Sequence, residues 1–382
     1  MASARPSPSD LLPGLGLLVA IALLAWGVAA VAPVPELLAA VLVGGVLANT
    51  VGVPSDFEPG AGTYALWLEV GIVLMGVRVS LDALVAAGPT LLVTVVGVVG
   101  FTLVVAESLA RGLDLQRRLG SLVAAGASVC GVSAVVAVAG AVRADEEQVA
   151  YATSAILVFD AVTLFAYPVL GGVLGLPDRV FGIWAGLTMF STGPVTAAGF
   201  AYSDVAGQWA TVAKLARNVL IGGLVVGYSI LYADRSPDPD ASPESDANTG
   251  YDTGSESESD AESESPSGAP TESAVGSAPK AGTESRSRSR ASFLRSLWHG
   301  FPKFVLGFLA MVVLASAGVF TDAQLTRIER AYRWAFLVAF AGLGTSIAAD
   351  ELRETGIRPL AVVALTLAVV SAVSLAVVHS VF

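Results

Sequence analysis

Two stretches of small and hydroxyl-bearing residues interrupt long apolar runs, and they are the places where this chain could bind a solute. The first is GASVCGVSAVVAVAG at 126–140, and the second is TMFSTGPVTAAG at 188–199. Gly and Pro weaken a helix, and Ser, Thr and Cys offer polar atoms where lipid favours Leu. Backbone that unwinds at membrane depth is tolerated only where protein or a watery cavity satisfies it. We therefore expect two broken helices that line one site. The alternative is that small residues let two helices pack closely.

Each unwound stretch would begin a half-helix whose free N–H groups and hydroxyls face an anion. Helix ends cannot supply a whole charge. Lys214 and Arg217, three residues apart on one helix face, would supply it, unless they anchor at the membrane interface instead. The expected substrate-binding residues are Ser128, Cys130, Gly131, Ser133, Thr192, Gly193, Pro194, Thr196, Lys214 and Arg217.

A polar stripe follows the first break along the chain. Thr153, Asp160, Thr163 and Tyr167 lie at steps of seven, three and four residues within the apolar run 147–175. An ionisable residue inside a span is costly unless it faces a cavity or a partner, so Asp160 is a functional candidate. We expect Asp160, with Thr153, to couple transport to a proton. The alternative is a structural carboxylate that is hydrogen-bonded to a neighbouring broken helix.

The elements that must position these residues are apolar helices. Hydrophobic residues make up 54% of the 382 residues, charged residues only 14%, and the mean hydropathy is +0.71, which indicates a polytopic membrane protein. We expect an all-α fold with two broken or re-entrant helices. About eleven hydrophobic segments are predicted, at roughly 11–31, 35–53, 63–80, 88–110, 119–142, 147–175, 180–200, 209–232, 302–320, 332–348 and 357–382.

One acidic stretch divides the chain. Residues 234–290 hold 13 acidic and five basic residues, which accounts for −8 of the net charge of −11. This composition cannot bury enough apolar surface to fold. We expect a transporter core at 1–232, a disordered acidic loop at 233–291 and the rest of the core at 292–382. The Lys and Arg distribution of the short loops favours a multi-pass protein of the cell membrane with this loop in the cytoplasm.

Several function classes are disfavoured by composition. The sequence has one cysteine, Cys130, and two histidines, His299 and His379, near segment ends. No intramolecular disulfide can form, and His-based metal sites and catalytic triads are not expected. A Cys130 nucleophile would need an activating base or cation, and the histidines lie only near segment ends. We therefore expect no enzyme activity, no cofactor, no metal and no nucleic-acid partner.

Seven stretches of the chain form a recognisable set of motifs. They are GIVLMGVRVSL at 71–81, SVCGVSAVVAV at 128–138, the run 146–176, WAG at 184–186, AAGFAYS at 197–203, ATVAKLAR at 210–217 and FVLGFLA at 304–310. Together they resemble the sulfate exporter family, whose members are polytopic membrane proteins named for an expected activity. The resemblance covers nearly the whole chain outside the acidic loop. That family is similar to the cation:proton antiporter and anion transporter group. The resemblance implies inverted repeats and crossed, broken helices.

The chain departs from the family pattern at two places. At the second break the family has His-Asp-Thr-Ser-Ser, whereas this chain has Phe-Ser-Thr-Gly-Pro at 190–194. The family has Asn where this chain has Asp160. A carboxylate has thus been lost on one wall of the expected site and gained on another.

We expect a secondary-active transporter that exports sulfate or a related small anion, with H+ or Na+ as the coupling ion. An oligomer is compatible with the sequence. The alternatives are a cation:proton antiporter that uses Asp160 and, in another class, a membrane structural or receptor protein, for which two broken helices would be unexplained. Proteoliposome counterflow with anions and sodium separates these classes.

Overall fold

The computed structural model describes residues 7–32, 34–233, 303–347 and 357–382, and the predicted acidic loop lies outside them except for Ala233. Every regular element in these ranges is helical. In order they are α1 (Pro8–Val31), α2 (Glu36–Thr50), α3 (Glu58–Ala61), α4 (Tyr64–Met75), η1 (Gly76–Arg78), α5 (Leu81–Gly112), α6 (Arg117–Ser128), α7 (Val132–Val142), α8 (Glu146–Val173), α9 (Asp178–Thr188), α10 (Thr192–Tyr202), α11 (Asp204–Asn218), α12 (Ile221–Ala233), α14 (Phe304–Ser316), α15 (Asp322–Thr345) and α17 (Ile357–Val381).

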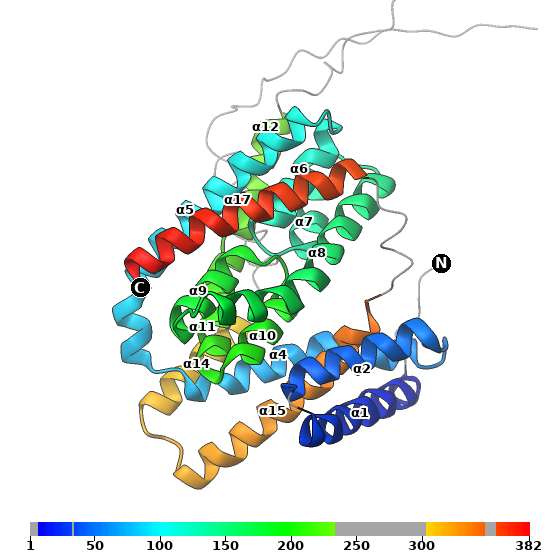
Figure 1. The fold of residues 1–382 in the computed structure, drawn as a ribbon, viewed down its shortest axis with the longest axis vertical. Helices are drawn as coiled ribbons and strands as arrows, with labels where there is room; N and C mark the ends of the chain where they lie inside the picture. The colour runs from blue at the N-terminus through cyan, green and yellow to red at the C-terminus, as the bar shows by residue number, and fades with distance from the viewer. Residues whose placement is uncertain (1–6, 33, 234–302, 348–356) are drawn as a thin grey trace, which may run out of the picture.

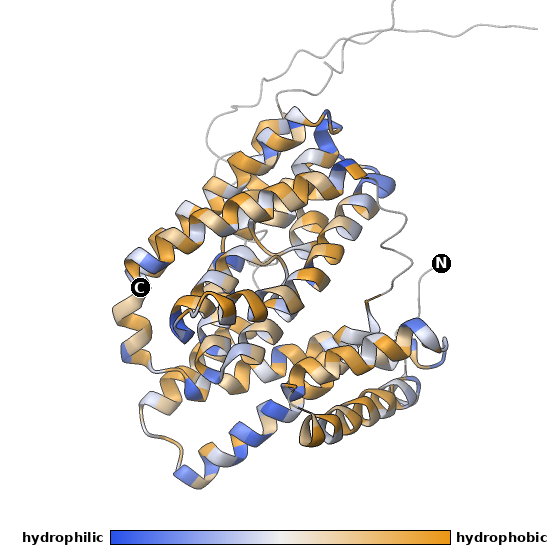
Figure 2. Ribbon diagram, in the orientation of Figure 1, coloured by the Kyte–Doolittle hydropathy of each residue, from blue (hydrophilic) through white to orange (hydrophobic). Residues whose placement is uncertain are grey.

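The described part of the chain has six helices long and apolar enough to span a membrane: Ser9–Val31, Glu58–Arg78, Leu81–Gly112, Glu146–Val173, Asp204–Ala233 and Ile357–Val381. Their outward faces carry exposed Val, Leu and Ile side chains, and hydrophilic residues gather at helix ends and along the first half of α15 (Figure 2). Such apolar surface belongs in lipid. The described chain is therefore an all-helical membrane protein, whereas the count of eleven segments and the inverted repeat stay predictions.

The helices form two bundles (Figure 1). In the first, α15 packs against α2 and α4, α1 packs against α2 and α3, and α14 packs against α4. We call this the terminal bundle. The second contains α5 to α12 with α17, and we call it the crossing bundle because both interrupted helices lie in it. The bundles meet mainly where α10 contacts α2 and α15 and where α14 contacts α5.

Both predicted breaks are present, and they produce four short helices. The helices α6, α7, α9 and α10 have 12, 11, 11 and 11 residues. At about 1.5 Å per residue each is roughly 17 Å long, which is too short to cross about 30 Å of hydrocarbon alone. Each interrupted segment thus places two helix ends inside the bundle.

Local sequence explains each break. Gly131 has φ +67° and ψ −132°, a conformation that other residues avoid, and a Cβ there would overlap Ser191 Oγ. The second break is extended at Met189 and Ser191, and Pro194 lies in the first turn of α10, where its missing N–H costs no hydrogen bond. The contact between Gly131 and Ser191 shows that the two breaks touch.

Candidate functional site

The α11 helix lies behind both breaks and ties them together through two buried cations. Lys214 is 0% exposed, and its Nζ donates to Val129 O at 2.8 Å, to Met189 O at 3.1 Å and to Phe190 O. These acceptors are the unpaired carbonyls that follow α6 and α9. Because the carboxyl end of a helix carries partial negative charge, a cation is stabilised there.

Arg217 serves the same two helix ends. Its side chain is 1% exposed; Nε donates to Ser128 O at 2.9 Å and Nη2 to Ala127 O at 2.7 Å, both on α6. Its Nη1 donates to Gly186 O at 3.3 Å, to Leu187 O at 2.7 Å and to Met189 O at 2.9 Å, at the end of α9. Arg217 therefore joins the two interrupted helices from behind.

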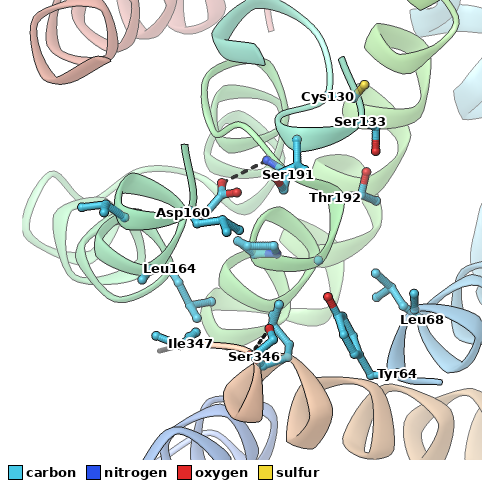
Figure 3. Close-up of a pocket in the computed structure, with 18 of the residues that line it drawn as sticks. Tyr64, Leu68, Cys130, Ser133, Asp160, Leu164, Ser191, Thr192, Ser346 and Ile347 are labelled. Atoms are coloured by element: carbon cyan, nitrogen blue, oxygen red, sulfur yellow. Dashed lines mark hydrogen bonds between the residues drawn. The ribbon is translucent and has the colours of Figure 1, made fainter. Parts of the chain in front are cut away.

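Asp160 lies on α8, in front of the second break. The carboxylate is 3% exposed, and Oδ1 accepts a hydrogen bond of 3.0 Å from the backbone N–H of Ser191 (Figure 3). Its other oxygen, Oδ2, is buried without a hydrogen-bond partner. Buried polar atoms are nearly always paired, so an orphaned carboxylate oxygen needs an explanation.

A cavity of about 440 Å³ lies between the two bundles at this point (Figure 3). It combines the breaks of the crossing bundle with residues of α4 and the end of α15. Lys, Arg and His are absent from its described lining. The lining residues are Tyr64, Ala65, Leu68, Cys130, Val132, Ser133, Ser154, Leu157, Val158, Asp160, Ala161, Leu164, Ser191, Thr192, Gly193, Pro194, Leu343, Ser346 and Ile347.

The amino ends of α7 and α10 both open into this cavity. Val132 and Ser133 begin α7, and Thr192 and Gly193 begin α10. N–H groups in the first turn of a helix lack an acceptor within the helix, and the helix dipole makes this end electropositive. The cavity therefore offers two sets of N–H donors, several hydroxyls and one carboxylate.

The structure brings together Cys130, Ser133, Asp160, Thr192, Gly193 and Pro194 of the expected site, all of which line the cavity. Gly131 lies directly behind them at the crossing. Thr153 lines a shallow neighbouring hollow that shares Ser154 and Leu157 with the cavity.

Other expected residues face elsewhere. Ser128 Oγ donates to Ala125 O at 3.1 Å, and Thr196 Oγ1 is 3.2 Å from Thr211 Oγ1 in the core. Lys214 and Arg217 use their donors on backbone carbonyls and do not line the cavity. Tyr167, the last residue of the polar stripe that contains Asp160, points away from the cavity as well, since its OH lies 2.5 Å from Ser371 Oγ on α17.

The sequence did not predict the residues that the terminal bundle contributes to the lining of the cavity. Tyr64 and Leu68 come from α4, and Leu343, Ser346 and Ile347 come from the end of α15. The Gly-Thr-Ser run at 344–346 gave a weak signal, because it places small and hydroxyl residues at the end of an apolar segment.

Metal ligands are not grouped in this part of the protein. Within the described residues, no cluster of three or more His, Cys, Asp or Glu side chains could hold a metal ion. Among the described residues that line the cavity, Asp160 is the one carboxylate, so any cation bound there would rely on hydroxyl and backbone oxygens as well.

Fold and site together define a multi-pass helical membrane protein with a cavity at two crossed, interrupted helices. A family model described as Conserved hypothetical protein 698 matches residues 13–245 and 278–363, and the chain belongs to this family. A UPF0324 membrane protein of Nitratidesulfovibrio vulgaris is 31% identical over 92% of this chain and 88% of the relative. One from Brucella melitensis is 25% identical over 97% and 91%, respectively. No solved structure gives a significant match.

Proposed function

We propose that this protein is a secondary-active transporter of the cell membrane that moves sulfate or a related small anion. The observation that carries the proposal is the meeting of two half-helix amino ends at one cavity, with Lys214 and Arg217 fixed behind them. Discontinuous helices that end at a shared cavity are the usual way in which transporters hold an ion within the membrane.

The cavity has suitable chemistry for a small oxyanion. The free N–H groups at the start of α7 and α10 can donate to oxyanion oxygens, and so can the hydroxyls of Ser133 and Thr192. The two buried cations raise the electrostatic potential of the cavity without contacting the solute. Because the cavity lies between the two bundles, a shift of one bundle against the other would expose it to the opposite side.

A cation:proton antiporter is the second candidate, and Asp160 favours it. Its Oδ2 has no partner, and no described cationic side chain lines the same cavity. A cation could bind Oδ2 together with nearby hydroxyls. The two candidates differ in the sign of the charge that the site accepts.

Counterflow in proteoliposomes tests the proposal, with sulfate, sulfite, methanesulfonate, small carboxylates and sodium as probes. We expect exchange of labelled sulfate or of another anion in this set. Exchange of sodium without exchange of any anion would contradict the proposal and favour the antiporter.

The single cysteine provides an independent measurement in the native chain. Cys130 lines the cavity and is the only cysteine in the sequence, so a thiol-specific methanethiosulfonate reagent reports on this site alone. We expect the transported anion to slow the modification of Cys130, with Cys130→Ser as the unreactive control. Protection of Cys130 by sodium but not by anions would favour the cation:proton antiporter.

A further inference from the structure

The two oxygens of Asp160 have different surroundings, and this difference carries a further inference. Oδ1 is fixed by the Ser191 N–H at 3.0 Å, at the residue that precedes α10. Oδ2 is buried, has no partner and belongs to a side chain that lines the cavity (Figure 3). A bare carboxylate oxygen in this position can take up a proton without breaking an existing hydrogen bond.

Carbonyl partners stabilise the charged forms of both buried basic side chains. Lys214 Nζ has three carbonyl acceptors, one for each hydrogen of an ammonium group, and such acceptors favour the charged form of the amine. Arg217 carries a guanidinium, which is positively charged at neutral pH. Both groups donate their hydrogen bonds to carbonyls at the ends of α6 and α9. Their positive charge therefore raises the electrostatic potential in the cavity, although their N–H groups do not bind a solute there.

The fixed charges around the cavity can be compared with those of a solute. Lys214 and Arg217 are positive, the carboxyl ends of α6 and α9 carry about half a negative charge each, and the amino ends of α7 and α10 carry about half a positive charge each. With Asp160 ionised, the site has an excess of about one positive charge, which matches a monoanion. With Asp160 protonated, the excess rises to about two, which matches a dianion such as sulfate.

We propose that Asp160 is the proton-coupling site, so that a proton on Oδ2 and a dianion in the cavity bind together and move together. This inference rests on the anion-transport proposal. The charged or titratable groups near Asp160 come from three other elements and from α8 itself. They are Lys214 and Arg217 of α11, Cys130 at the first break, Tyr64 of α4 and, two turns along α8, Tyr167.

Thermodynamic linkage gives the sign of the effect. If protonation of Asp160 strengthens anion binding, anion binding strengthens protonation by the same factor. Anion affinity therefore falls as pH rises, by up to about tenfold per pH unit because one proton is involved. The Coulomb interaction with the proton scales with the charge of the anion, so a dianion is affected more strongly than a monoanion.

Sulfate and methanesulfonate are matched probes for this inference. Both present oxygens bonded to a tetrahedral sulfur, they differ by one charge, and neither changes its charge between mildly acidic and mildly alkaline pH. Calorimetry on the purified full-length chain should show sulfate binding that weakens with rising pH and takes up about one proton per anion. For each anion we compare the affinity at acid pH with the affinity at alkaline pH. This ratio for sulfate should be about the square of the ratio for methanesulfonate, because the interaction energy doubles with the charge of the anion.

Asp160→Asn mimics the protonated state and is the decisive variant. We expect it to bind sulfate at every pH as the native protein does at low pH. Asp178→Asn, the same change at an exposed position in the first turn of α9, should keep the native pH dependence. If Asp160→Asn fails to fold, two measurements on the native chain still test the coupling role. They are the number of protons taken up per bound sulfate and the comparison of sulfate with methanesulfonate.

Three results would overturn the coupling role. They are pH-independent sulfate binding in the native protein, native pH dependence in folded Asp160→Asn, and loss of all anion binding in that folded variant. The last result would make Asp160 a direct ligand. Failure of the transport proposal has a different signature, because then none of the anions binds or exchanges at any pH.

Discussion

Lys214 and Arg217 are the two cations nearest the breaks, and their partners determine the effect of substituting them. From the sequence they were expected to contact the anion. In the structure every donor for which a partner is identified goes to a backbone carbonyl of the interrupted helices. Their charge reaches the site through space, and their hydrogen bonds hold the site together.

Arg217→Ala should therefore act first on folding. Removing the guanidinium leaves buried carbonyls of α6 and α9 without donors, which we expect to cost at least about 3 kcal/mol. Thermal unfolding in detergent measures this loss, with Arg118→Ala, an exposed arginine on α6, as the control. Arg217→Lys should recover part of the stability. Native stability combined with lost anion binding in Arg217→Ala would instead make Arg217 a ligand.

At the residue scale, the sequence was sufficient to predict those site residues whose own type also indicates unwound backbone. Ser133, Thr192 and Pro194 were found because hydroxyls, Gly and Pro in an apolar run indicate unwound backbone. The roles of Lys214 and Arg217 could not be found in this way, since they depend on α11 packing behind both breaks. Tyr64 and Ser346 were missed because nothing local shows that α4 and α15 face the crossing.

The first break depends on one glycine, which allows a prediction at the scale of a helix. Gly131→Ala would place a Cβ at φ +67° and against Ser191 Oγ, so both the backbone and the contact between the breaks must shift. We expect a loss of about 1–3 kcal/mol in stability, together with weaker ligand binding. Unfolding curves and anion affinity measured on the same preparation check this expectation.

Gly140→Ala is the matched control in the same helix. Gly140 lies in α7 with nothing within 4 Å of the Cβ that would be added. Alanine in a helix is favoured over glycine by about 0.5–1 kcal/mol, so this variant should be as stable as the native protein or more stable. Equal effects of the two substitutions would mean that the conformation of Gly131 is unimportant.

At the element scale, hydropathy predicted apolar helices and the two interruptions, because glycine, proline and hydroxyl content is a local property. Whether a short half-helix crosses or re-enters is set by its neighbours. The packing of α9 against α11 shows why: a Cβ at Gly186 would lie 2.7 Å from Ala213 Cβ, a closeness that only the partner helix reveals. The acidic loop was assigned from composition alone and lies outside the described residues.

At the scale of the whole molecule, the cavity lies beside the carboxyl end of α15, and the two bundles contact each other directly nearer the start of this helix. Phe200 of α10 contacts Phe336 of α15 with ring centroids 5.2 Å apart. Beyond them, Arg333 of α15 pairs with Asp204 of α11 at 3.1 Å. Arg333 precedes Ser346 by 13 residues, which is about 20 Å along a helix. The crossing bundle and the terminal bundle therefore contact each other near Arg333, and the cavity lies between them near Ser346.

If transport requires the two bundles to separate where Arg333 meets Asp204, a covalent link there should stop it. The ion pair itself is exposed and contributes at most about 1 kcal/mol, so it opens easily. We would introduce Asp204→Cys and Arg333→Cys into a Cys130→Ala background that has first been shown to transport. A short bifunctional thiol reagent with a reducible linker should then abolish counterflow, and reductant should restore it. Each single cysteine variant treated in the same way is the control. Full transport by a chain whose cross-link is verified by mass spectrometry would show that alternating access leaves this contact intact.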